Sequence, residues 1–180
     1  IVYIPHFMSW VVAASIFSMI LSPTSAGLVN DVLMKLHLIT DNIYFLGDQK
    51  WWRFSYYIIN VWKDTGWGTI IFMATLAGIS PELYEAASMD GANRFQKMIY
   101  ITLPALNNTI VTVLVLNLAK VMNLFESVFV LQNDAVIKVS DVLQTYIYTQ
   151  TFNSGAIPDY GYTTAVGMFS SIISCILVLA

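Results

Sequence analysis

Long apolar stretches separated by shorter polar segments dominate the pattern of this chain. Each stretch is close to the roughly 20 residues that an α-helix needs to cross the hydrocarbon core of a bilayer, although the first reaches that length only when Ile1 to Ile4 are included. The pattern predicts an all-α polytopic membrane protein. Its membrane-spanning helices are expected at about residues 1–22, 55–79, 104–125 and 160–180.

The polar segment 23–54 is expected outside the bilayer. Apolar residues spaced along 28–36 predict a short amphipathic helix within it. Gly47-Asp48 predicts a turn, and Trp51-Trp52 are expected at the membrane edge, where tryptophan is enriched.

The polar segment 126–159 is also expected outside the bilayer. Within it, Ser140 is placed to cap a helix that continues to about Phe152 and ends near Asn153-Ser154-Gly155. Four spans make the loops alternate between the membrane faces, so this segment shares a face with the first loop and opposes the segment 80–103. The loops carry nearly equal numbers of Lys and Arg, so the positive-inside rule does not decide which face is cytoplasmic.

Two charged residues interrupt the second span. Lys63-Asp64 stand among its apolar residues, followed by Gly66 and Gly68, which indicates either a kinked span or a surface helix followed by a shorter one. We favour the kinked helix. Trp62 and Trp67 flank the charged pair as interfacial residues do, so we expect Lys63-Asp64 near the outer water boundary, with the lysine reaching toward the surface.

A polar stripe marks the third span. Asn117, Lys120, Asn123 and Glu126 recur every third residue and would lie along one side of a helix. Two interpretations stay open: helix packing with snorkelling at the interface, or the wall of a water-filled path for a hydroxyl-rich solute. Under the second, we predict that Asn117, Lys120 or Asn123 lines the path.

Composition supports the membrane class and excludes several others. Hydrophobic residues make up 57% of the 180 residues and charged residues only 11%, which is too apolar for a soluble domain of this size. The net charge of -3 is scattered, with no basic run, so no nucleic-acid partner is predicted. No catalytic constellation, metal-ligand spacing or phosphate-binding glycine loop is present. We therefore predict no enzyme activity, cofactor or metal.

The charged segment 80–103 carries the local signals of a structured loop. Ser80-Pro81-Glu82 is a helix start, and Asp90-Gly91 is the matching stop. Between them Leu83, Ala86 and Ala87 share one face, which is narrow enough to seat in a groove. A second short helix is expected from Asn93 to Tyr100, before Leu103-Pro104 opens the third span.

This segment also carries a signature. Glu85-Ala86-Ala87, Gly91, Ile101 and Leu103-Pro104 fill every fixed position of the EAA motif of ABC-importer permeases at the expected spacing. The chain therefore resembles that family over essentially its whole length. Asp90 and Ala92, which make Asp-Gly-Ala, are similar to its sugar-importer branch. The segments 45–48, 141–146 and 162–167 resemble the polysaccharide-type permeases within that branch.

The resemblance implies a fold, a location and partners. The fold would be the helical bundle of a type I ABC-importer permease in a bacterial cytoplasmic membrane, with segments 23–54 and 126–159 extracytoplasmic. We expect the chain to be a fragment that lacks two upstream helices and a short basic tail. The implied partners are a cytosolic ATPase dimer, a second permease subunit and an extracytoplasmic solute-binding protein.

The segment 80–103 is called the coupling loop below, because the resemblance implies that it engages the ATPase. The implied coupling residues are Glu85, Ala86, Ala87, Asp90, Gly91, Ala92, Ile101, Leu103 and Pro104. The predicted cargo is an oligosaccharide or polysaccharide fragment. The alternatives are a permease for another solute, such as glycerol phosphate or an amino acid, and a membrane scaffold that transports nothing.

Overall fold

The computed structural model describes residues 2–24, 26–153 and 159–179, and every regular element in these ranges is helical. This agrees with the predicted all-α class. In chain order the elements are η1 (Ile4–Phe7), α1 (Trp10–Ile20), α2 (Leu28–Lys35), α3 (Gln49–Ala77), α4 (Pro81–Met89), α5 (Arg94–Lys97), η2 (Met98–Thr102), α6 (Leu103–Val121), α7 (Glu126–Leu131), α8 (Ile137–Ser140), α9 (Leu143–Phe152) and α10 (Tyr160–Leu179).

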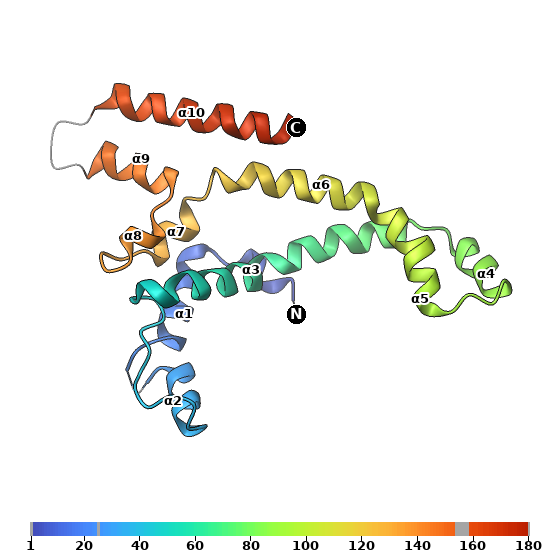
Figure 1. Cartoon of the computed structure of the whole chain (residues 1–180), viewed down its shortest axis with the longest axis horizontal. Helices are drawn as coiled ribbons and strands as arrows, with labels where there is room; N and C mark the ends of the chain where they lie inside the picture. Colours follow the sequence, from blue (N-terminus) through green and yellow to red (C-terminus); the bar gives the residue numbers. More distant parts are fainter. Residues whose placement is uncertain (1, 25, 154–158, 180) are drawn as a thin grey trace.

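Two long helical segments form an extended arm, shown in Figure 1. Helix α3 runs out along the arm, α4 lies at the far end, and α5, η2 and α6 return beside α3. A hydrogen bond of 2.8 Å between the hydroxyls of Thr75 and Thr109 joins α3 to α6, the two antiparallel helices of the arm. The remaining short helices gather at the opposite end, where α10 packs against both α6 and α9.

The predicted first span is not one continuous helix. A short 3-10 turn, η1, ends at Phe7, and the backbone of Met8 and Ser9 is extended. The Ser9 hydroxyl then caps α1 by accepting a hydrogen bond from the amide of Val12. With 11 residues, α1 is roughly 16 Å long and cannot cross the hydrocarbon core by itself.

The second predicted span is part of a longer, unbroken helix. Helix α3 has 29 residues and begins at Gln49, because the Asp48 carboxylate accepts a hydrogen bond from the amide of Lys50 and caps the first turn. Lys63-Asp64 therefore lie inside the helix, and the alternative of a surface helix followed by a shorter one is wrong.

The third predicted span begins ten residues earlier than expected. Residues Arg94–Val121 form one helical run of 28 residues, so Leu103-Pro104 does not open a new helix. The stretch before Pro104 is the π-helical segment η2, in which the amide of Leu103 bonds to the carbonyl of Met98 five residues earlier. This wider turn leaves room for the proline ring, which would clash with the preceding turn of a regular α-helix.

Two helices in the described ranges are long and apolar enough to cross a membrane. They are Arg94–Val121 and Tyr160–Leu179, while Trp10–Ile20 is apolar but shorter. The second of them agrees with the span predicted from Tyr160, whose last residue, Ala180, lies outside the described residues. The four-span arrangement as a whole stays a prediction.

A small core holds the short helices together at the end opposite α4. It consists of Ala14, Leu46, Trp52, Tyr56, Ile59, Val128, Leu131 and Val136. Trp52 is 3% exposed, and its indole nitrogen donates a hydrogen bond of 3.0 Å to the carbonyl of Leu131. Trp52 is therefore not an exposed anchor for lipid headgroups, because its ring stacks on Tyr56 inside this core, while the place of Trp51-Trp52 relative to the membrane edge stays a prediction.

The start of α9 also differs from the prediction. The Ser140 hydroxyl is buried and donates to the carbonyl of Val136, so it caps nothing. The Thr145 hydroxyl instead accepts from the amide of Val142 and donates to the Asp141 carboxylate. Helix α9 ends at Phe152 as predicted, with Asn153 as the capping residue, and Ser154 and Gly155 lie outside the described residues.

One asparagine fixes the fold of the segment between α1 and α3. Asn30 is fully buried in α2, and its amide nitrogen donates to the carbonyls of Ser22 and Ile43 at 2.8 and 2.9 Å. Its amide oxygen accepts from the amide of Ile43 at 2.9 Å. The Asn30 side chain thus joins three segments, which are the residues just after α1, the helix α2 and the irregular stretch before α3.

We expect Asn30→Ala to destabilise the protein by about 3 kcal/mol, because it leaves three buried backbone groups without partners. The measurement is the thermal midpoint of the purified protein in detergent. Asn42→Ala is the matched control, since Asn42 is exposed and makes no side-chain hydrogen bond in the described part of the chain. Equal midpoints for the two variants would show that Asn30 does not hold the segment.

Candidate functional site

The coupling loop contains a well-defined short helix. The Ser80 hydroxyl accepts a hydrogen bond from the amide of Glu82, and Pro81 occupies the first turn of α4. Asp90 ends the helix, and Gly91 follows with φ +77°, the left-handed conformation that glycine adopts without strain. The helix predicted for this stretch is confirmed, as is the turn that follows it.

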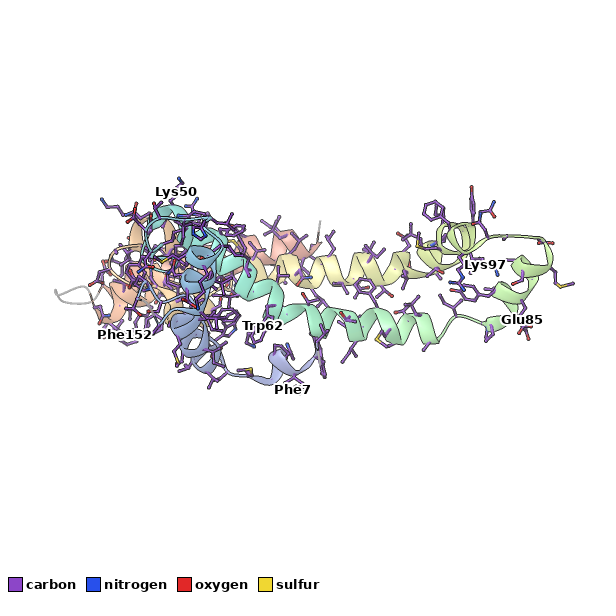
Figure 2. All side chains as sticks on the ribbon, turned by 90° about the horizontal axis from the view of Figure 1, so that it is seen from below. Phe7, Lys50, Trp62, Glu85, Lys97 and Phe152 are labelled. Atoms are coloured by element: carbon purple, nitrogen blue, oxygen red, sulfur yellow. The ribbon has the colours of Figure 1, made fainter. Side chains whose placement is uncertain are left out.

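The two faces of α4 differ in exposure. Tyr84 and Ala87 are half-buried against the rest of the loop, while Glu82, Leu83 and Glu85 are exposed. Ala86 and Met89 are exposed too, so the predicted face of Leu83, Ala86 and Ala87 is divided between the two sides. Figure 2 shows Glu85 at the far end of the arm, distant from Lys50 and Phe152 in the opposite end.

The second helix of the loop begins where the sequence predicts. The Asn93 side chain accepts from the amide of Gln96 at 2.9 Å, and the Gln96 side chain accepts from the amide of Asn93 at 2.8 Å. This reciprocal capping box starts the long helix Arg94–Val121. Ile101, Leu103 and Pro104 lie in its first turns, so the residues of the EAA motif are divided between α4 and the long helix.

A cavity of about 380 Å³, with both polar and apolar walls, lies where α3 meets the end of α6, the start of α7 and the segment 6–10. Four charged side chains line it: Lys63, Asp64, Lys120 and Glu126. Asn60, Asn123 and Ser127 add further hydrogen-bonding groups. Opposite charges are present in equal number, but Lys63 and Ser127 already bond to His6 and Tyr56 within the protein.

A second cavity of about 230 Å³ lies between α3 and α6. Asp64 and Lys120 line both cavities, one from each helix. Asn117 and Gly68 line only the second cavity. The three predicted path residues therefore face cavities between α3 and α6, with Asn117 on one side of Lys120 and Asn123 on the other.

The predicted stripe does not follow one helix, however. Helix α6 ends at Val121, and the Asn123 amide side chain folds back to the carbonyl of Ala119 at 3.1 Å. Glu126 belongs to the next helix, α7. The turn after α6, and not helical spacing alone, returns Asn123 and Glu126 to the cavity that contains Lys120.

Lys63 does not reach toward the surface as predicted. Its side chain is 6% exposed, its ammonium group donates to the carbonyl of His6 at 3.2 Å, and the ring of Trp10 lies 5.0 Å away. Desolvation of the ammonium is compensated by this carbonyl and by the cation–π contact. Lys63 therefore joins the N-terminal segment to α3, whereas Asp64 beside it stays exposed.

His6 also lines the larger part of this region, the cavity of about 380 Å³, and its side chain makes weaker contacts than that of Lys63. The imidazole of His6 stacks on Trp67 at 5.0 Å, and its Nδ1 lies 3.9 Å from an Asp64 carboxylate oxygen. Among the described residues, no three His, Cys, Asp or Glu side chains gather closely enough to hold a metal ion. In α9, the hydrogen bond that the Tyr146 hydroxyl shares with the Tyr162 hydroxyl raises the pKa of Tyr146 above its ordinary value.

Exposure of Asp64 leads to a labelling prediction. In a Cys175→Ala background, we expect Asp64→Cys to react readily with a membrane-impermeant maleimide added from outside, because the Asp64 side chain is 56% exposed and lines two cavities. Lys63→Cys, at the buried neighbouring position, is expected to react slowly in the same folded protein. Complete protection at position 64 would contradict access from the outer side.

Comparison with known proteins decides the family. The family described as binding-protein-dependent transport system inner membrane component matches residues 1–180. The chain belongs to this family. Among curated relatives, the protein LplB of Bacillus subtilis is 42% identical over 178 residues, which is 98% of this chain and 54% of LplB.

A second relative and a solved transporter add to the comparison. The polygalacturonan/rhamnogalacturonan permease YteP of Bacillus subtilis is 39% identical over 99% of this permease chain and 54% of its own length. A crystal structure of a bacterial ABC transporter that imports the acidic polysaccharide alginate superposes with a TM-score of 0.91 at 37% identity, over 99% of this chain and 61% of that one. A crystal structure of a bacterial alginate ABC transporter in complex with an alginate pentasaccharide-bound periplasmic protein superposes with the same TM-score of 0.91. The chain spans about half the length of the curated relatives that it matches.

Sequence reasoning missed several residues that line the cavities or form hydrogen bonds in the coupling loop. It did not assign Asp64 to the same cavities as Lys120, although both charged residues interrupt apolar helices. It also missed Tyr84, Ser88 and Thr102 of the coupling loop, which make hydrogen bonds between α4 and the long helix or within α4. The sequence offers one signal for these contacts, which is that Ser88 and Lys97 are both polar residues in a short loop.

Proposed function

We propose that this chain is one transmembrane permease subunit of an ATP-driven importer in a bacterial cytoplasmic membrane. It moves an oligosaccharide or polysaccharide fragment inward and couples to a cytosolic ATPase dimer through residues 80–103. The observation that carries the proposal is the similarity to the alginate importer, with a TM-score of 0.91 over 99% of the chain. The name of YteP supports the same class of cargo.

The coupling residues fit this proposal by their place in the fold. Helix α4 lies at the tip of the arm, and its outer face exposes Glu82 and Glu85 to a partner. Glu85 is the residue of the EAA motif that is expected to contact the ATPase. Ala87, Gly91 and Ala92 shape the inner side and the turn, so they act by placing Glu85.

The solute path is proposed between α3 and α6. Asn117, Lys120 and Asn123 line cavities of about 230 and 380 Å³ there, and at least one of them contacts the passing saccharide. A second permease subunit completes the path, and an extracytoplasmic solute-binding protein delivers the cargo. The complex of the alginate importer with its periplasmic protein supports this last partner.

The test is reconstitution of the full-length protein. It is co-expressed with the second permease and the ATPase encoded beside it, purified, and placed in proteoliposomes with the solute-binding protein. We expect the ATPase to co-purify. Uptake is measured with a panel of oligosaccharides from alginate and polygalacturonate, with maltodextrins as neutral cargo, and we expect ATP-dependent uptake of at least one of them. ATP-independent passage, or uptake only of amino acids or glycerol phosphate, would refute the saccharide importer.

A further inference from the structure

Four residues of the coupling loop form a closed circuit of hydrogen bonds. The hydroxyl of Tyr84 in α4 lies 2.9 Å from the hydroxyl of Thr102, and Thr102 donates to the carbonyl of Lys97 over a long 3.5 Å. The ammonium group of Lys97 returns to α4 by donating to the Ser88 hydroxyl. Ser88 in turn donates to the carbonyl of Tyr84 at 2.7 Å. The circuit thus crosses between α4 and the long helix twice.

The direction of each bond follows from the number of protons. A hydroxyl group carries one proton, and that of Thr102 is used toward the carbonyl of Lys97. Tyr84 must therefore donate to Thr102. Likewise the proton of Ser88 is used toward the carbonyl of Tyr84, so Ser88 accepts from Lys97. The hydroxyls of Thr102 and Ser88 each accept one hydrogen bond and donate another, and bonds linked in this way strengthen one another, while the Tyr84 hydroxyl donates.

Little else fixes how α4 is oriented. None of its residues is buried, so apolar packing does not hold it against the long helix. Its backbone is joined to that helix by a turn at Gly91, where a Cβ atom would have nothing within 4 Å. Tyr84 and Ser88 stand one turn apart on the same side of α4. Two bonded points on one face restrict both tilt and rotation of α4, and they add to the backbone hydrogen bonds of the turn at Gly91.

The partners of α4 lie at a special place in the long helix. Lys97 is the last residue of α5, and Thr102 is the last residue of the π-helical segment η2. The circuit therefore brackets the five residues in which the helix departs from α-helical geometry. Single π-helical turns lack the tight packing of α-helix and occur frequently at functional sites.

We propose that Tyr84, Ser88, Lys97 and Thr102 are positioning residues that form a rigid joint between α4 and the long helix Arg94–Val121, and that this joint transmits ATPase movement to the solute path. The proposal rests on the proposed importer function, and it names residues outside the EAA motif. A displacement of α4 by the ATPase then moves Lys97 and Thr102 with it, through these side-chain hydrogen bonds as well as through the turn at Gly91. Lys120, near the opposite end of the same helical run, lines the cavities beside α3.

The experiment measures saccharide transported per ATP hydrolysed in proteoliposomes that contain the complete importer. Tyr84→Phe and Thr102→Val each remove one hydroxyl from the circuit and keep side-chain volume. We expect each to lower the ratio roughly threefold to tenfold, in line with the loss of one net hydrogen bond. The double variant should fall little further, since both changes break the same circuit. Tyr100→Phe is the matched control, because Tyr100 lies in the same helix and is 76% exposed.

The outcomes separate the joint from the proposed function. If Tyr84→Phe and Thr102→Val transport as much saccharide per ATP as Tyr100→Phe, the joint is refuted while the importer stands. If these variants only reduce the recovered amount of complex, with an unchanged ratio in the complex that remains, the circuit supports folding alone and the proposal is wrong. If the wild-type chain neither binds an ATPase nor transports, the proposed function is refuted together with the joint.

Discussion

Gly91→Val is expected to abolish most coupled transport while leaving the protein folded in the membrane. Gly91 has φ +77°, and a β-branched residue in that region is strongly disfavoured because its side chain clashes with its own backbone. The space around the position is open, with nothing within 4 Å of an added Cβ atom. The defect would therefore come from backbone conformation and not from a collision with neighbouring side chains.

The physical consequence is a displaced α4. If residue 91 leaves the left-handed region, the chain exits α4 in another direction and Glu85 no longer points from the tip of the arm. We expect saccharide-stimulated ATP hydrolysis in proteoliposomes to fall at least tenfold, which corresponds to roughly 1.4 kcal/mol of lost coupling. The amount of inserted protein, measured by membrane fractionation, should not change.

A graded series of substitutions tests this cause. Gly91→Asn should retain more activity than Gly91→Val, since asparagine adopts positive φ more readily than other residues. Gly167→Val is the matched control for side-chain size, because Gly167 also has open space around it but shows no positive φ. Stimulated hydrolysis at the wild-type level in Gly91→Val would show that the conformation of this turn does not matter for coupling.

Local sequence signals predicted the coupling loop well. Ser80-Pro81-Glu82 and Asp90-Gly91 define α4 because capping and turn formation involve residues that are near one another in sequence. The capping box at Asn93 is local for the same reason. The break before α1 was also local, since Ser9 caps that helix, but the long apolar stretch around it concealed the signal.

Long-range contacts account for the predictions that failed. Trp52 resembles an interfacial residue in sequence, yet its partner Leu131 lies 79 positions away. Lys63 is buried because His6 supplies a carbonyl 57 positions away, and no helical pattern reveals that contact. The continuation of the helix through Pro104 depends on the π-helical register of η2, which a proline in a charged loop does not indicate.

Lys120→Met is expected to lower saccharide uptake roughly tenfold with normal assembly, because an ammonium group that contacts a solute contributes a charge-assisted hydrogen bond. Lys120 lies in the last turn of α6, where the negative end of the helix favours a cation. Initial rates of uptake in proteoliposomes are the measurement, alongside the yield of the intact complex.

The location of Lys120 separates a path residue from one that only snorkels. A snorkelling lysine would extend to the headgroups, and its replacement by methionine would not alter uptake. Lys120 instead lines the same two cavities as Asp64, which lies on α3. Asn117→Leu and Asn123→Leu should each reduce uptake as well, since each lines one of those cavities. Asn107→Leu is the control, at an exposed position of α6 that lines neither of them.

The opposite charges of Lys120 and Asp64 allow a second test of the proposed solute path. If Lys120 and Asp64 contact the same saccharide from opposite helices, Lys120→Met and Asp64→Asn should not be additive, because either change disrupts the geometry in which both groups bind. Their double variant should then lose less than the product of the two single effects. Normal uptake in Lys120→Met and in both asparagine variants would show that these three residues do not line the path and contribute to packing instead. A residue that contacts the solute cannot lose its hydrogen-bonding group without changing the rate of uptake.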